Sequence, residues 1–85
     1  MQGTQTLRRR AAVSNPKVAD RLGLHFTMVS RLRSGARLPS VEMMVKIEEE
    51  FNWSIAHQVK ARISPATTYG AEFEHALMKE YGEEL

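Results

Sequence analysis

Cysteine is absent from the 85-residue chain, which excludes a disulfide framework and a thiolate metal site. Long apolar runs are absent too, since none approaches the roughly 18–20 residues that a membrane-spanning helix needs. The N-terminal stretch MQGTQTLRRRAAVS lacks the apolar core of a signal peptide. We therefore expect one small protein of the cytoplasm, with no contact to a membrane.

Signals for strands and for catalysis are also missing. No stretch alternates apolar and polar residues over about four to eight positions between turn residues. No nucleophile–base pair, phosphate-binding glycine loop or acid dyad stands out, and no two histidines have metal-binding spacing with a third ligand nearby. The acidic run Glu48–Glu50 fits a solvated helix face. We expect an all-α protein that is not an enzyme and holds no metal, cofactor or small-molecule ligand.

Charge is divided unevenly along the chain. Residues 1–46 contain nine Lys and Arg against two acids, a balance of +7, whereas residues 47–85 contain three bases and eight acids, a balance of −5. The two balances sum to the net charge of +2. Such polarity indicates that one half faces a polyanion, although a basic face can also be merely solvated.

Helical periodicity and capping residues are what the sequence does contain. Ser14 or Asn15 can cap a helix whose first residue is Pro16, and Gly23 and Gly35 stand where helices end in a left-handed residue. The pattern predicts six helices. They are Leu7–Val13, Pro16–Leu22, Phe26–Ser34, one between the cap Ser40 and Asn52, one from the cap Ser54 to Ile63, and Thr68–Tyr81.

Several features between Ser14 and Ser54 agree in register with one known motif. They are the small Ala19, the turn Leu22-Gly23-Leu24, the trio Val29-Ser30-Arg31, the loop residues Gly35, Arg37 and Pro39, and the stretch Phe51-Asn52-Trp53-Ser54. Together they resemble the lambda-repressor-like helix-turn-helix family of bacterial and phage regulators. The resemblance implies a compact five-helix DNA-binding domain over residues 1–63, with a sixth, C-terminal helix over residues 64–85.

The resemblance also implies which residues would touch DNA. Base reading falls to Phe26, Thr27, Ser30 and Arg31 on the helix that enters the major groove, with Ser30 and Met28 near the groove wall. Arg31 can fork onto guanine O6 and N7, while Phe26, where many relatives carry glutamine, can only offer apolar contact to thymine methyl groups. Alternatively, Phe26 folds back into the core. His25 departs from the usual Ser or Thr cap and is expected to fill the turn.

Contacts to DNA phosphates are expected at both ends of the helix-turn-helix unit, where they position the protein without selecting a sequence. The expected phosphate-binding residues are Arg8, Asn15, Lys17, Arg33, Ser34, Arg37 and Ser40, with Arg9 and Arg10 adding to the basic surface.

The C-terminal helix carries an apolar stripe formed by Tyr69, Phe73, Leu77 and Tyr81. The stripe either closes the protein's own core or forms a dimer contact. Acids share this segment, so we expect it to face away from DNA. These acids are Glu72, Glu74, Glu80, Glu83 and Glu84.

The resulting hypothesis is a sequence-specific regulator, a repressor of the Cro-like bacteriophage or mobile-element type, that binds a short inverted repeat of double-stranded DNA as a homodimer. It would work in the bacterial cytoplasm, at the nucleoid when bound. Three alternatives stay open. They are an antitoxin whose acidic C-terminal helix binds a protein, a protein-interaction module that has lost DNA binding, and an architectural protein of DNA excision.

Overall fold

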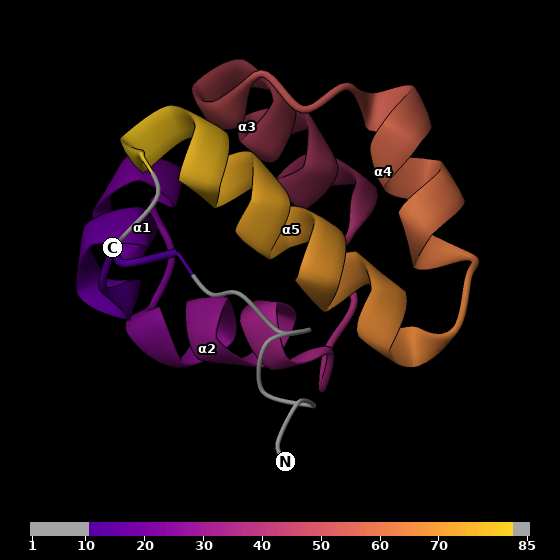
Figure 1. Ribbon diagram of the computed structural model, residues 1–85, viewed down its shortest axis with the longest axis horizontal. Helices are drawn as coiled ribbons and strands as arrows, with labels where there is room; N and C mark the ends of the chain where they lie inside the picture. The colour runs from indigo at the N-terminus through magenta and orange to yellow at the C-terminus, as the bar shows by residue number, and fades with distance from the viewer. Residues whose placement is uncertain (1–10, 83–85) are drawn as a thin grey trace, which may run out of the picture.

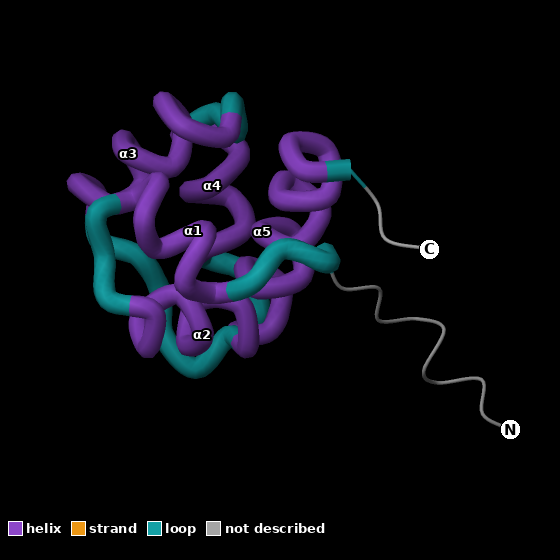
Figure 2. The backbone as a smooth tube through the Cα atoms, turned by 90° about the vertical axis from the view of Figure 1, so that its left-hand side faces the viewer, coloured by secondary structure: helices purple, strands orange, loops and turns teal. Residues whose placement is uncertain are grey.

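The computed structural model describes residues 11–82, except for the side chain of Ala66, and these residues are all-helical. Figures 1 and 2 show helices joined by short loops. They are α1 (Asn15–Leu22), α2 (Phe26–Ser34), α3 (Val41–Phe51), α4 (Ile55–Arg62) and α5 (Ala66–Tyr81). Within this part of the chain there is no strand, which confirms the predicted fold class. None of the described helices has the length and apolarity needed to cross a membrane.

The count of six helices is not confirmed. The first expected helix, Leu7–Val13, lies mainly outside the described residues, and residues 11–14, which are described, are not helical. Residues 11 and 13 instead run beside α2, because their carbonyl oxygens accept hydrogen bonds from Arg33. The expected C-terminal helix is present as α5, the fifth described helix, and it begins at Ala66, two residues earlier than predicted.

Local capping chemistry explains where the other helices begin and end. The hydroxyl of Ser14 accepts the Lys17 N–H, and the hydroxyls of Ser40 and Ser54 do the same for residues three positions further on. Helices α1 and α2 end at glycines with φ of 67° and 85°, and α3 ends at Asn52 with φ of 58°. These starts and ends agree with the boundaries predicted from sequence, except that α1 begins at Asn15 instead of Pro16 and α4 ends at Arg62 instead of Ile63.

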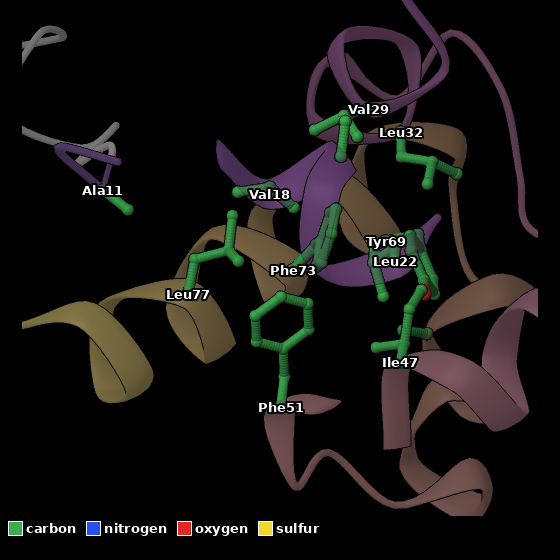
Figure 3. Close-up of a cluster of buried hydrophobic side chains, with 12 residues drawn as sticks. Ala11, Val18, Leu22, Val29, Leu32, Ile47, Phe51, Tyr69, Phe73 and Leu77 are labelled. Carbon is green, nitrogen blue, oxygen red and sulfur yellow. The ribbon is translucent and has the colours of Figure 1, made fainter. Parts of the chain in front are cut away.

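The hydrophobic core lies between the helix-turn-helix pair and α5. Figure 3 shows Val18 and Leu22 of α1 with Val29 and Leu32 of α2, packed against side chains of α3 and α5. Helix α5 packs against α2, α3 and α4. It therefore completes the core of the helix-turn-helix unit and does not stand apart from it.

The apolar stripe of α5 was expected either to close the protein's own core or to form a dimer contact. The structure shows the first, because most of the stripe is buried in the core. Tyr69, Phe73 and Leu77 are fully buried. Tyr81, at the end of the stripe, is half-buried beside Phe51, with ring centroids 6.0 Å apart. Residues 69, 73 and 77 are therefore unavailable for a dimer contact, and the dimer hypothesis for this stripe is wrong.

A buried polar network joins α3, α4 and α5. The side-chain amide of Gln58 donates to the carbonyl oxygens of Met44 and Trp53, both at 2.8 Å, and its oxygen accepts the Tyr69 hydroxyl at 2.8 Å. Burial raises the pKa of Tyr69, so its hydroxyl stays protonated and remains a donor. Since all these buried groups are paired, the network fixes the end of α5 that lies nearest α4.

Candidate nucleic-acid interface

The link between α1 and α2 is a tight turn at Gly23-Leu24-His25. The Leu24 N–H donates to the Ala19 carbonyl at 3.0 Å, and His25 Nδ1 accepts the Thr27 N–H at 3.1 Å. Ala19 is buried where the two helices meet, as the sequence predicted for a small residue at a close crossing. His25 therefore does more than fill the turn, because its side chain is the N-cap of α2.

One face of α2 is turned to solvent. Phe26, Ser30, Arg31 and Ser34 are exposed and Thr27 is half-buried, whereas Val29 and Leu32 are buried. At 100° per residue, the five outward residues fall within one arc of the helix. The structure thus brings together all four residues predicted to read bases, Phe26, Thr27, Ser30 and Arg31, with Ser34 beside them. Met28 is half-buried at the edge of this face.

Phe26 is 52% exposed, so the alternative in which it folds back into the core is wrong. Its ring lies against the imidazole of His25, with centroids 4.4 Å apart and an angle of 27° between the planes. Two exposed, stacked rings thus occupy the N-terminal end of α2.

Arg33 corrects one phosphate-contact prediction. Its guanidinium is buried and donates to both carboxylate oxygens of Glu74, at 2.8 and 3.0 Å. It also donates to the carbonyl oxygens of Ala11 and Val13 and to Asn15 Oδ1, at 3.1, 2.8 and 2.9 Å. With its N–H groups occupied in this way, Arg33 cannot reach a phosphate, and its predicted phosphate contact is wrong.

Arg21, like Arg33, is a base of residues 1–46 that is neutralised by acids of residues 47–85. It pairs with Glu50 at 3.1 Å and Glu80 at 3.3 Å, and its guanidinium lies 4.7 Å from the centroid of the Phe51 ring. Burial lowers the pKa of Arg21, but its hydrogen bonds to Glu50, Tyr81 and Glu80 outweigh this effect and raise it. Part of the charge polarity along the sequence is therefore cancelled inside the molecule.

The acidic run at residues 48–50 is likewise not a simple solvated face. Glu50 pairs with Arg21, and Glu48 Oε2 accepts the Ile55 N–H at 3.1 Å, so these two carboxylates hold elements together. Of the three, only Glu49 is exposed, and the other two are half-buried. Among residues 11–82, no group of three potential metal-ligating His, Asp or Glu side chains is placed to share an ion.

The geometry of α1, its turn and α2 agrees with comparison against known protein families. A family model described as helix-turn-helix (HTH_3) matches residues 6–57, more than half of the chain. The chain belongs to this lambda-repressor-like helix-turn-helix family. Such proteins are DNA-binding transcription regulators, and double-stranded DNA is their ligand. No curated protein and no solved structure matches the chain.

The match covers α1, α2, α3 and the start of α4. Helix α5 lies beyond the matched residues, yet it supplies Tyr69, Phe73 and Leu77 to the core under α2. This regulator therefore completes its helix-turn-helix core with a segment outside the family match.

The remaining predicted phosphate contacts have different surroundings. Lys17 and Arg37 are exposed, and Lys17 Nζ lies 5.7 Å from the centroid of the Tyr81 ring. Asn15 is half-buried, and its Oδ1 is occupied by Arg33. The exposed hydroxyls of Ser34 and Ser40 bond their own backbone, at Arg31 and Met43. Arg8, with Arg9 and Arg10, lies outside the described residues.

Arg62 was not predicted to matter for the DNA-binding unit. Its Nε donates to the carbonyl oxygen of Pro39 at 2.9 Å, which ties α4 to the loop that leaves α2. Pro39 is fully buried, so this loop is held from both sides. The contact joins residues 23 positions apart, and no local sequence pattern predicts a bond between residues so distant in the chain.

Proposed function

We propose that the protein is a sequence-specific repressor that reads the major groove of double-stranded DNA with α2, and that it acts by occupying DNA rather than by catalysis. The observation that carries this proposal is the single outward face of α2. It combines an apolar ring, hydroxyls and the guanidinium of Arg31, which has no acid within ion-pair distance among the described residues. A nine-residue helix fits a groove about 12 Å wide.

Each outward side chain suits a different feature of the groove. Arg31 can donate two hydrogen bonds to guanine, and Thr27 and Ser30 can donate to or accept from base edges. Lys17 at the start of α1 and Arg37 after α2 flank this face in sequence and are exposed, so they are the bases best placed to bind phosphates. With Arg21 and Arg33 neutralised, the proposed phosphate contacts are fewer than the charge count suggests.

We further propose that two copies bind an inverted repeat, because one short recognition helix reads only a few base pairs and needs a partner about 34 Å away. The apolar surface that supports this pairing lies on α3 and α4. Val41 is 68% exposed and Ile63 76%, with Val45 and Val59 also exposed. Val41 and Val45 lie four positions apart on α3, and Val59 of α4 lies four positions before Ile63, the C-cap of that helix, so each pair shares a face.

The two helix faces adjoin because α3 and α4 run antiparallel. The bond from Ile55 to Glu48 joins one end, that from Gln58 to Met44 the middle, and that from Arg62 to Pro39 the other end. We name the exposed set Val41, Val45, Val59 and Ile63 the α3–α4 apolar face. The side chains of Glu42, Lys46 and Lys60 near it are exposed and charged, as in the polar rim of an interface.

A second copy of this chain is the occupant that we propose for the α3–α4 apolar face. Val41 directly follows Ser40, the cap of α3, at the end of the loop that leaves α2. The α3–α4 apolar face therefore begins beside the loop that leaves α2. A two-fold interface uses the same surface of both copies, so the α3–α4 apolar face of one copy would pack against the same face of the other.

The test is selection of duplexes from a random pool, followed by fluorescence anisotropy of wild type and Arg31→Ala on selected and random duplexes. Wild type should prefer selected sites by at least about a thousandfold. Arg31→Ala should lose about 1–3 kcal/mol on selected sites and little on random ones. Lys79→Ala, an exposed change on α5, is the matched control and should leave both affinities unchanged. Equal binding of wild type to both kinds of duplex would refute sequence-specific recognition.

A further inference from the structure

The core packing does not account for the exposed, stacked rings of His25 and Phe26. Both rings are exposed, and Phe26 is the large exposed apolar residue of α2. The other large exposed apolar residues described, at positions 41, 45, 59 and 63, form the α3–α4 apolar face. Phe26 therefore belongs neither to the core nor to the surface proposed for pairing.

His25 holds a fixed position beside Phe26. Its Nδ1 accepts the Thr27 N–H at 3.1 Å, which ties the imidazole to the first turn of α2. The nitrogen that accepts this bond carries no proton. The imidazole plane then lies under the Phe26 ring, with centroids 4.4 Å apart. The cap of the helix is thus also the support for an exposed phenyl ring.

We infer that His25 and Phe26 act together as a reader of the 5-methyl group of a pyrimidine in the major groove. This inference rests on the proposed function, because it requires α2 to enter that groove. A phenyl ring neither donates nor accepts a hydrogen bond, so it gains nothing from the polar edges of the bases. The apolar group that a base pair presents in the major groove is the methyl on C5 of thymine.

The same methyl group is present in 5-methylcytosine, so the chemistry of the ring does not distinguish the two bases. The neighbours of Phe26 on the outward face, Ser30 one turn on and Thr27 beside it, can bond the polar atoms of the same or an adjacent pair. His25 contributes as a positioning residue, because it keeps the phenyl ring outward.

The first experiment selects binding sites from two random duplex pools, one with cytosine and one with 5-methylcytosine in its place. Each thymine of a selected half-site is then replaced in turn by deoxyuridine, which lacks only the methyl group. One position should lose about fourfold in affinity, the effect of one buried methyl group. In Phe26→Ala, deoxyuridine at that position should cause no loss of affinity. Deoxyuridine at other positions should change the affinity of wild type and variant by the same factor.

The second pool separates the two possible bases. If the position selects 5-methylcytosine, replacement by cytosine should lose the same factor, and restoring the methyl group should regain it. If no position of any selected site depends on a methyl group, the inference is overturned, although the proposed function stands. If wild type selects no site from either pool, the proposed function fails, and the inference fails with it.

The role of His25 needs a variant that keeps the helix cap and removes the ring. His25→Asn does so, because asparagine is among the best N-cap residues. Its melting temperature should match wild type, while its affinity for the selected site and its dependence on the methyl group should both fall. Should His25→Asn match wild type in both DNA measurements, His25 is a cap alone and its place in the reader is overturned. His25→Ala, which loses the cap and the ring, is the reference for the loss of both.

Discussion

Arg33 of α2 and Glu74 of α5 form a buried two-point ion pair, with Nε to Oε2 at 2.8 Å and Nη2 to Oε1 at 3.0 Å. The side chains are 3% and 7% exposed. This pair joins the last turn of α2 to a helix that lies outside the family match. The orientation of α2 therefore depends on α5 as well as on the helix-turn-helix itself.

Glu74→Ala should lower the free energy of unfolding by about 3–5 kcal/mol, because it leaves the Arg33 guanidinium buried without its counter-charge. Urea denaturation followed by circular dichroism measures the change. Glu72→Ala, on the exposed side of the same helix, is the control and should change stability by less than about 0.5 kcal/mol. Equal stability of the two variants would mean that the ion pair does not hold α5 to α2.

Gly70→Ala should destabilise the protein although alanine favours helices. A Cβ at this position would lie 2.5 Å from the Arg33 carbonyl oxygen and 3.1 Å from the Gly35 nitrogen, both backbone atoms. Overpacking of this kind costs about 1–3 kcal/mol, which exceeds the gain of about 1 kcal/mol from helix propensity. Thermal unfolding should show a lower melting temperature. Thr67→Ala, at an exposed position of α5, is the comparison, and a Gly70→Ala variant as stable as Thr67→Ala would contradict the close approach of α5 to α2.

Arg37→Ala should weaken binding to selected and random duplexes by similar factors, because a phosphate contact carries no base information. The slope of log affinity against log salt should become shallower by about one unit. Stability should not change, since Arg37 is exposed. Arg33→Ala makes the contrast, because its main effect should be on the free energy of unfolding. If the slope for Arg37→Ala is identical to that of wild type, Arg37 does not contact a phosphate.

Ile63→Asn should reduce affinity for a duplex with two half-sites by about tenfold or more and leave affinity for a single half-site unchanged, if the α3–α4 apolar face joins two copies. The free chain should keep its stability, because the side chain is 76% exposed. Anisotropy titrations on the two duplexes provide the measurement. Thr67→Asn, on α5, is the control. If Ile63→Asn and wild type bind the longer duplex with the same affinity, two copies do not pair through the α3–α4 apolar face.

Short-range features were predictable from the sequence because their causes lie within a few residues of one another. The Ser14, Ser40 and Ser54 caps and the left-handed Gly23 and Gly35 each depend on one turn of chain. The outward face of α2 follows from the helical period together with the apolar residues on its other side. Family membership follows from the same local features, repeated at a fixed spacing over residues 6–57.

Long-range pairing was not predictable, because nothing near Arg33 in sequence shows that a carboxylate 41 positions away will meet it. The same holds for Arg21, whose partner Glu80 is 59 positions away, and for the use of the α5 stripe in the core. The sequence by itself determined the helices, their ends and the helix-turn-helix. The tertiary structure alone decided which arginines are neutralised, because the packing of α5 brings Glu74 beside Arg33 and Glu80 beside Arg21.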